Sequence, residues 1–221
     1  MKYNYIAIER EYASGGSEIG KKVSDILNIP CYGREILERA AKNRGVSVEY
    51  IEELEENTAG SFLYSLYKMS SITKGSDNAP TVSESLSLDE MNIIRELSGN
   101  GPAVFVGRTA AFALKDRSDV LKVFIHASYE FREKRARNLY GISDDELKNV
   151  IKRYDKRRAA YYKSNFGNDW KDYSGYDLVL DSSVWVLKNA LRLYRNVQDN
   201  INIIKKTDKF GLFLFYAVFD F

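Results

Sequence analysis

The stretch from Arg10 to Ser17 holds residue types that proteins use to bind phosphate. It joins an apolar segment, residues 3–8, to a helical pattern whose apolar residues recur at three- and four-residue spacing. A glycine-containing turn before a helix can point free backbone N–H groups at an anion, and the helix dipole favours negative charge there. Glycine also lets the backbone approach the anion closely.

The phosphate-loop motif G-x-x-x-x-G-K-[ST] is matched only in part. Gly15 can be its second glycine, and Ser17 can be the hydroxyl residue that reaches Mg²⁺. Arg10 stands where the first glycine belongs, and Gly16 stands where the lysine belongs. Two interpretations therefore stay open on this stretch alone: a phosphate-binding loop, or a plain corner between a strand and a helix.

The composition limits the classes of protein to consider. The 221 residues suffice for one domain, or for one domain with a small insertion. A net charge of +2 gives no reason to expect nucleic acid as a partner, although the basic residues 132–158 favour a local anion site. A single Cys and a single His exclude a disulfide framework and the usual transition-metal ligand sets. The N-terminus has no apolar signal core, so we expect a cytoplasmic protein.

Strand and helix patterns alternate along the chain, which predicts an α/β fold with a mostly parallel sheet. Strands are expected within residues 3–8, 28–33, 103–106, 121–125 and 177–181. Helices are expected at 17–27, 34–44, 87–97, 110–114, 129–141 with Ser128 as its cap, 144–163 and 184–197, with a further one after Ser47. Capping boxes at 87–90 and 143–146 set two of the helix starts. Because ligands bind at the carboxyl ends of parallel strands, residues 10–17, 32–34 and 107–108 should meet at one edge.

Two segments do not fit the alternation. Residues 57–85 are rich in Ser, Thr, Gly and Asn and predict either a mobile flap over a site or a plain surface loop. The aromatic and apolar residues 209–221 are too few to span a bilayer. For this tail we expect a contact between chains, as in a homo-oligomer, or disorder, and no stable membrane insertion.

Taken in order, several stretches resemble the cytidylate kinase-like family of nucleoside monophosphate kinases, up to about residue 200. They are IEREYASGGSEIGKKV, IPCYGREIL, VFVGRTAAFAL, VFIHASYEFREKR, IKRYDKRRAAYYKSNFGNDW and YDLVLDSS. The resemblance implies a P-loop NTPase fold, a three-layer α/β/α sandwich with a mostly parallel five-stranded sheet. It implies one kinase-like domain, residues 1–200, with an acceptor-side flap at 57–85 and a helical lid at 137–163. The hydrophobic tail, 201–221, would lie outside it.

The resemblance also implies roles for individual residues, with ATP and Mg²⁺ as cofactors and nucleotides as small-molecule substrates. The donor phosphates and ATP would be bound by Ser14, Gly15, Gly16, Ser17, Glu18, Arg132 and Arg135, with Ser17 on the metal. Beyond the resemblance, we expect Arg10 to add a positive charge at the same phosphates. The acceptor would be bound by Tyr32, Arg34, Arg108, Asp155 and Arg158. The catalytic group would be Arg108, Lys152, Asp155 and Arg158.

Some positions depart from the family pattern, most of all the lysine replaced by Gly16, the strand-end acid replaced by Val106 and His126 before Ala127. Phosphoryl transfer needs alignment and positive charge more than covalent help, so surrounding arginines, Arg10 among them, can offset part of the loss. Three functions remain open. The first is transfer of the ATP γ-phosphoryl group to a nucleoside monophosphate, CMP or dCMP first. The others are a nucleotide-binding or sensing module with little turnover, and a small-molecule kinase with a non-nucleotide acceptor.

Overall fold

The computed structural model describes residues 3–51, 82–167 and 169–184. Five strands form one parallel sheet in the order β2-β3-β1-β4-β5. They are β1 Tyr5–Arg10, β2 Cys31–Tyr32, β3 Ala103–Val106, β4 Val120–His126 and β5 Leu178–Asp181. The helices are α1 Gly16–Leu27, α2 Arg34–Arg44, α5 Val82–Ser98, α6 Ala110–Ala113, α7 Tyr129–Tyr140 and α8 Asp144–Phe166, and Tyr173–Gly175 is a 3-10 turn. The predicted three-layer fold with a parallel five-stranded sheet is confirmed.

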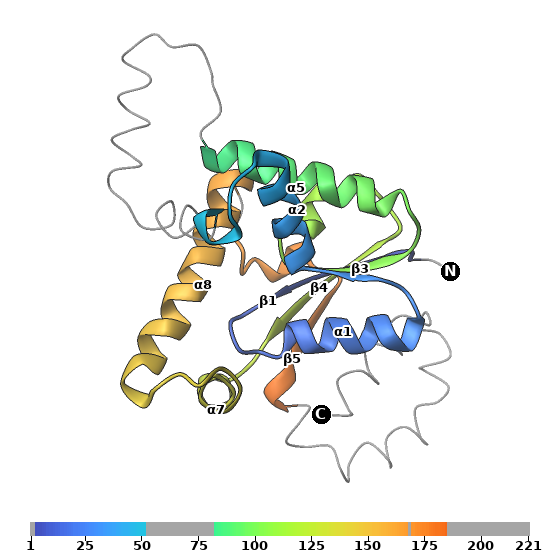
Figure 1. Ribbon diagram of the computed structural model, residues 1–221. Helices are drawn as coiled ribbons and strands as arrows, with labels where there is room; N and C mark the ends of the chain where they lie inside the picture. The colour runs from blue at the N-terminus through green and yellow to red at the C-terminus, as the bar shows by residue number, and fades with distance from the viewer. Residues whose placement is uncertain (1–2, 52–81, 168, 185–221) are drawn as a thin grey trace, which may run out of the picture.

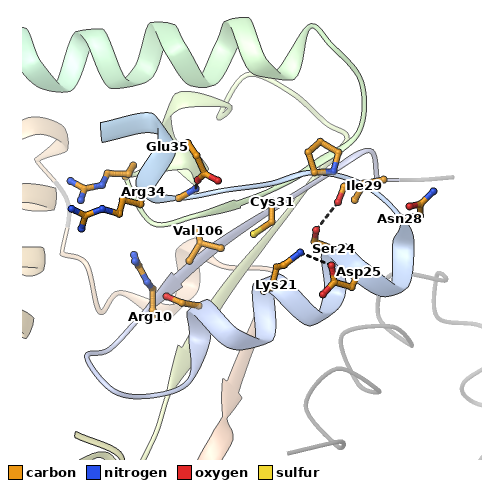
Figure 2. Close-up of a pocket in the computed structure, with 14 residues that line it drawn as sticks. Arg10, Lys21, Ser24, Asp25, Asn28, Ile29, Cys31, Arg34, Glu35 and Val106 are labelled. Carbon is orange, nitrogen blue, oxygen red and sulfur yellow. Dashed lines mark hydrogen bonds and ion pairs between the residues drawn. The ribbon is translucent and has the colours of Figure 1, made fainter. Parts of the chain in front are cut away.

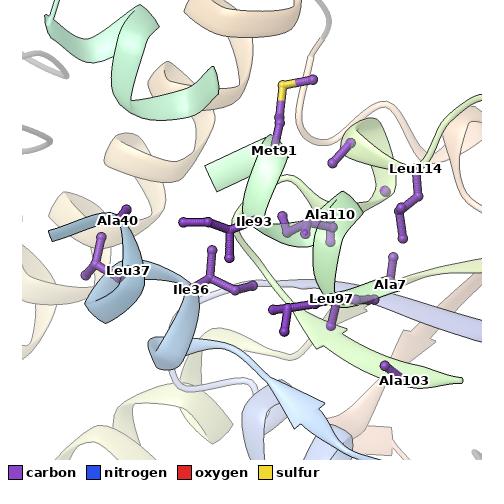
Figure 3. Packing of buried hydrophobic residues seen from close by; sticks show 14 of the residues in the cluster. Ala7, Ile36, Leu37, Ala40, Met91, Ile93, Leu97, Ala103, Ala110 and Leu114 are labelled. Carbon is purple, nitrogen blue, oxygen red and sulfur yellow. The ribbon is translucent and has the colours of Figure 1, made fainter. Parts of the chain in front are cut away.

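Alternate residues of β1 enter two separate cores, which explains why this strand is apolar throughout. Ile6 and Ile8 pack with Ile19 and Val23 of α1 on one face of the sheet. Tyr5 and Ala7 face the other cluster, which α2, α5 and α6 cover (Figure 3). The sheet therefore lies between α1 and the α2–α5–α6 layer, and α7 and α8 stand beyond its edge (Figure 1).

The first strand differs from the prediction in its bounds. Residues 3–8 were expected, whereas β1 runs from Tyr5 to Arg10, because its pairing with β4 continues through Glu9 and Arg10. The extension brings two charged residues into the end of a central strand. Glu9 is buried, and Arg10 is the last residue before the loop.

The start of α5 is also different from the prediction. The helix begins at Val82, so Ser87 lies inside it and does not cap it, and residues 82–85 of the expected flap are helical. The reason is tertiary: Glu90 accepts hydrogen bonds from Arg108 and Tyr161, which come from other elements of the fold. Two other predicted starts hold, since Ser128 caps α7 and Ser47 accepts from the Tyr50 N–H ahead of a helical turn at residues 48–51. α8 begins after Ser143 as predicted, but the Ser143 hydroxyl donates to the Glu146 carboxylate and caps no backbone N–H.

The remainder of the flap, residues 57–81, the tail from 201 and most of the expected C-terminal helix lie outside the described residues. The lid range, 137–163, covers the end of α7, the turn at 141–143 and most of α8. Within the described part of the chain, no helix has the length and apolar character needed to cross a membrane.

Candidate active site

The loop between β1 and α1 has the conformation of an anion-binding turn. Gly15 caps α1 with a positive φ of 83°, and no side chain caps the helix, so its first N–H groups are left for a ligand. Ala13 is also left-handed, with φ 58°. Ser17 is exposed in the first turn, whereas the buried Ser14 hydroxyl donates to the Glu11 carbonyl at 2.9 Å. Ser17 can thus reach a ligand with its side chain, and Ser14 can offer only its backbone.

Arg10 lies where this loop, β3 and α1 meet. A Cβ added at Gly16 would stand 2.5 Å from the Arg10 Cβ, and one added at Gly107 would overlap Arg10 Nη1. The Arg10 Nε is buried and has no hydrogen-bond partner within the described residues. Burial, and then repulsion from Arg158, lowers the pKa of Arg10 to about 9. The side chain as a whole is part-buried, and the nearby Glu9 carboxylate opposes this lowering but makes no hydrogen bond or ion pair with it, which leaves the guanidinium able to bind an anion in either cleft.

Arg108 and Arg158 complete a group of three arginines around this point. Arg108 is the second residue after β3, in a left-handed conformation with φ 56°, and its Nη1 lies 3.3 Å from the buried Glu90 carboxylate. Arg158 comes from α8, and its Nη1 donates to the Arg10 carbonyl at 2.9 Å. Burial lowers the pKa of Arg158 as well. Three separate segments therefore bring positive charge to the carboxyl ends of β1 and β3.

Two clefts open on either side of this group, and Arg10 and Arg108 line both. The larger, about 810 Å³, runs between α1 and the segment carrying β2 and the start of α2, and includes Ser17 and Arg34. Figure 2 shows Arg10 rising from the end of β1 into it. The smaller, about 220 Å³, is lined by Glu9, Arg158 and the aromatic residues Tyr154, Tyr161, Tyr162 and Trp170. The arginines thus stand between two spaces that separate ligand groups could fill.

The other acceptor-side residues are placed unevenly. The Tyr32 ring packs on Phe105 with centroids 5.7 Å apart, so it belongs to the core and does not line the larger cleft. Arg34 does line that cleft and also pairs with Glu38 at 3.3 Å. Lys152 is exposed and lines a different surface groove with Lys148 and Tyr129, away from the arginine group.

Asp155 and Arg158 do not form the ion pair that their spacing suggests. Asp155 accepts from the Tyr12 N–H at 2.8 Å and pairs with Arg132 at 2.5 Å. Arg132, itself buried, also lies 3.6 Å from Glu11. This network fastens α7 and α8 to the loop that follows β1.

Arg135 belongs to α7, and its side chain packs against the loop between β1 and α1. Its guanidinium is 3.5 Å from the position of a Cβ added at Gly15, and its Nη2 pairs with Glu18 at 2.9 Å. The Tyr140 hydroxyl lies 3.4 Å from the same carboxylate. The two arginines expected to meet ATP therefore both reach the loop, and both already have carboxylate partners.

Comparisons with known proteins give the family of the chain. Residues 5–184 match the model of the cytidylate kinase-like family. The chain belongs to that family. The cytidylate kinase of Methanosarcina mazei is 27% identical over 82% of this chain and 89% of its own length, and that of Pyrobaculum islandicum is 28% identical over 85% and 89%. A crystal structure of an uncharacterized protein from Eubacterium ventriosum has a TM-score of 0.60 and 22% identity over 92% of this chain and 99% of that one, which supports the fold.

Within this candidate site, one charged residue escaped the sequence reasoning. Glu9 is buried in the smaller cleft, and its Oε1 has no hydrogen-bond partner in the described part of the chain. Burial raises the pKa of this carboxyl, although Arg10, Arg158 and Arg108 oppose the rise. The available signal was a charged residue continuing an apolar central strand, which is uncommon unless the residue is paired or functional.

A metal site built from protein ligands alone is absent from the described residues, which hold no cluster of three or more His, Cys, Asp or Glu suited to a cation. The exposed Ser17 hydroxyl at the head of α1 fits a different arrangement. There a Mg²⁺ ion arrives with phosphate groups and takes one oxygen from the protein.

Proposed function

We propose that the protein is a kinase that transfers the ATP γ-phosphoryl group to a nucleoside monophosphate, with CMP or dCMP as the first acceptors to test. The observation that carries the proposal is the meeting of Arg10, Arg108 and Arg158 between two clefts at the head of α1. The cytidylate kinases of Methanosarcina mazei and Pyrobaculum islandicum support the choice of acceptor.

In this reaction an oxygen of the acceptor monophosphate attacks the γ-phosphorus, and the bond to the β–γ bridging oxygen breaks to leave ADP. The acceptor phosphate is already an anionic nucleophile, so the protein need not supply a base. Its task is to align the two phosphates and stabilise the charge on the transferring group. Mg²⁺ bound with ATP supplies part of that positive charge, and Ser17 is the residue that would hold it.

The residues divide between the two substrates. The backbone of Ser14, Gly15 and Gly16 would cradle the donor phosphates, and Arg135 would close over them. Arg108 and Arg158 would hold the acceptor phosphate and the transferring group, because planar guanidinium groups bind phosphate oxygens in pairs. Residues 57–85 and 137–163 remain our candidates for the acceptor-side flap and the lid.

The test is ADP release, measured by a coupled assay, with each common ribo- and deoxyribonucleoside monophosphate as acceptor. We expect turnover with CMP and dCMP above the ATPase background and weaker turnover with purine acceptors. Folded protein that releases no ADP above background with any acceptor would exclude the proposal.

A second candidate, a nucleotide-binding module with little turnover, is favoured by the ion pairs of Arg132 and Arg135. Both would have to leave Asp155 and Glu18, at least in part, to bind phosphate. Calorimetry separates the two candidates: a module of this kind binds ATP or CMP with measurable heat while the coupled assay stays at background.

A further inference from the structure

The two positions that break the phosphate-loop motif are in direct contact. The motif has glycine where this chain has Arg10, and lysine where this chain has Gly16. A Cβ added at Gly16 would be 2.5 Å from the Arg10 Cβ and 2.8 Å from its Cγ, closer than real Cβ atoms approach other atoms. A lysine at position 16 is therefore incompatible with the arginine at position 10 in this conformation. The two departures depend on each other.

We infer that the phosphate-binding cation has moved from position 16 to position 10, and that the Arg10 guanidinium binds the donor phosphates at the point where they face the acceptor. The inference rests on the proposed function only in taking a polyphosphate as the ligand. It assigns Arg10 the task that the motif gives to its lysine.

The surroundings of Arg10 fit a bound phosphate better than a structural role. No hydrogen bond or ion pair joins its guanidinium to the rest of the described chain, whereas Arg108, Arg132 and Arg135 each pair with a carboxylate. An arginine whose Nε is fully buried and which served packing alone would be expected to have such a partner. Arg10 instead faces both clefts. Its five N–H donors can bind oxygens of two neighbouring phosphate groups, which a lysine ammonium does less well.

Gly107 supports the same inference from the other side. It has a φ of 70°, and an added Cβ would overlap Arg10 Nη1. The end of β3 thus leaves room for the guanidinium just as the start of α1 does. Two backbone segments far apart in sequence are both shaped to admit this one side chain.

The experiment measures binding of inorganic tripolyphosphate by calorimetry and phosphoryl transfer by the coupled assay, on the full chain. Arg10→Gln keeps the aliphatic stem and removes the charge, and we expect it to weaken tripolyphosphate binding by roughly ten- to a hundredfold. Arg39→Ala is the matched control. Arg39 is a half-exposed arginine of α2 that lies 3.9 Å from Glu96, and its loss should change binding by less than about twofold.

Exchanging the residue types at positions 10 and 16 gives a more stringent test. Arg10→Gly alone should bind weakly, and Gly16→Lys alone should also bind weakly because its side chain meets Arg10. The double variant Arg10→Gly/Gly16→Lys restores the complete motif and should bind at least about tenfold more tightly than Arg10→Gly. Thermal melts establish which variants are folded. If the variants with changes at positions 10 and 16 are unfolded, tripolyphosphate binding by Arg10→Gln alone tests the inference.

The inference is overturned if Arg10→Gln binds tripolyphosphate as the parent does, or if a folded double variant binds no better than Arg10→Gly. It is equally overturned if the parent binds no tripolyphosphate. Arg10-dependent binding without phosphoryl transfer to any nucleotide would uphold the inference and defeat the proposed function. Phosphoryl transfer that is indifferent to Arg10→Gln would do the reverse.

Discussion

Glu90 is the residue whose replacement should best connect the stability of the fold with the working of the site. It is fully buried on α5, lies 3.3 Å from Arg108 Nη1 and accepts a hydrogen bond from the Tyr161 hydroxyl of α8 at 2.5 Å. One carboxylate thus joins two helices to the arginine that follows β3. We predict that Glu90→Gln both destabilises the protein and weakens its handling of the acceptor.

The expected magnitude follows from the two contacts. A glutamine has one acceptor oxygen where glutamate has two, so either Arg108 or Tyr161 loses its hydrogen bond to an oxygen of residue 90. At 3.3 Å and an effective dielectric constant near 20, the attraction between Glu90 and Arg108 is about 5 kcal/mol, and desolvation of the buried carboxylate offsets much of it. A lost hydrogen bond to a charged group costs roughly 1.5–3 kcal/mol, so we expect a net loss near 2 kcal/mol. For a protein of this size that lowers Tm by about 4–8 °C.

The assay pairs thermal and urea denaturation with acceptor titrations in the coupled assay. Arg108 without its fixed partner should raise the acceptor KM by about tenfold and leave the ATP KM within about twofold. Glu96→Gln is the control, because Glu96 lies on the same helix but is exposed and only 3.9 Å from Arg39. If Glu90→Gln and Glu96→Gln have the same stability and the same acceptor KM, the reasoning about Arg108 is wrong.

Three further predictions concern the same region. Gly107→Ala should lower activity at least about tenfold by displacing Arg10, whereas Gly45→Ala, with a similar φ of 67° and nothing within 4 Å, should cost stability only; equal activities would contradict this. Because burial lowers the folded pKa of Arg10 to about 9, well below its usual value, charged Arg10 costs stability below pH 9. That cost should fade as pH rises above 9. Between pH 7.5 and 10, urea denaturation should therefore show the free energy of unfolding of the parent rising relative to that of Arg10→Gln. A difference in unfolding free energy that stays constant over this range would refute the prediction. Arg132→Gln should cost roughly 3 kcal/mol by leaving Asp155 without its cation, and amide exchange in α8 should then accelerate; unchanged protection would show that the Arg132–Asp155 contact does not hold this helix.

The fold could be predicted from the sequence because its signals are local. The apolar run from Ile6 to Ile8 is explained by two cores on opposite faces, and Ser128 caps α7 as its residue type suggests. The predicted start of α5 was wrong because the contacts that involve Glu90 are not local in sequence. Glu90 looked like the end of a capping box, but its partners Arg108 and Tyr161 are 18 and 71 residues away. A local sequence pattern cannot show that an arginine distant in sequence binds the same carboxylate.

The same limit explains the result for Asp155 and Arg158. Residues three apart on a helix can pair, but the partners they have, Arg132 and the Arg10 carbonyl, come from other segments. The position of the candidate site could be predicted from the sequence, since the carboxyl ends of parallel strands meet at one edge of the sheet. Which side chain meets which within that edge depends on backbone geometry, above all on the left-handed residues at 13, 15, 107 and 108.

The imperfect motif shows what a position-by-position comparison omits. Compared with the phosphate-loop motif one position at a time, Arg10 replaces a glycine and Gly16 replaces a lysine. In space they are a single arrangement, because the room for the arginine stem is the room that a side chain at position 16 would need. The charge near the phosphate loop is therefore conserved in number, while its point of attachment shifts from the first turn of α1 to the end of β1. From there one guanidinium faces both clefts, so the shift would couple donor and acceptor through a single side chain.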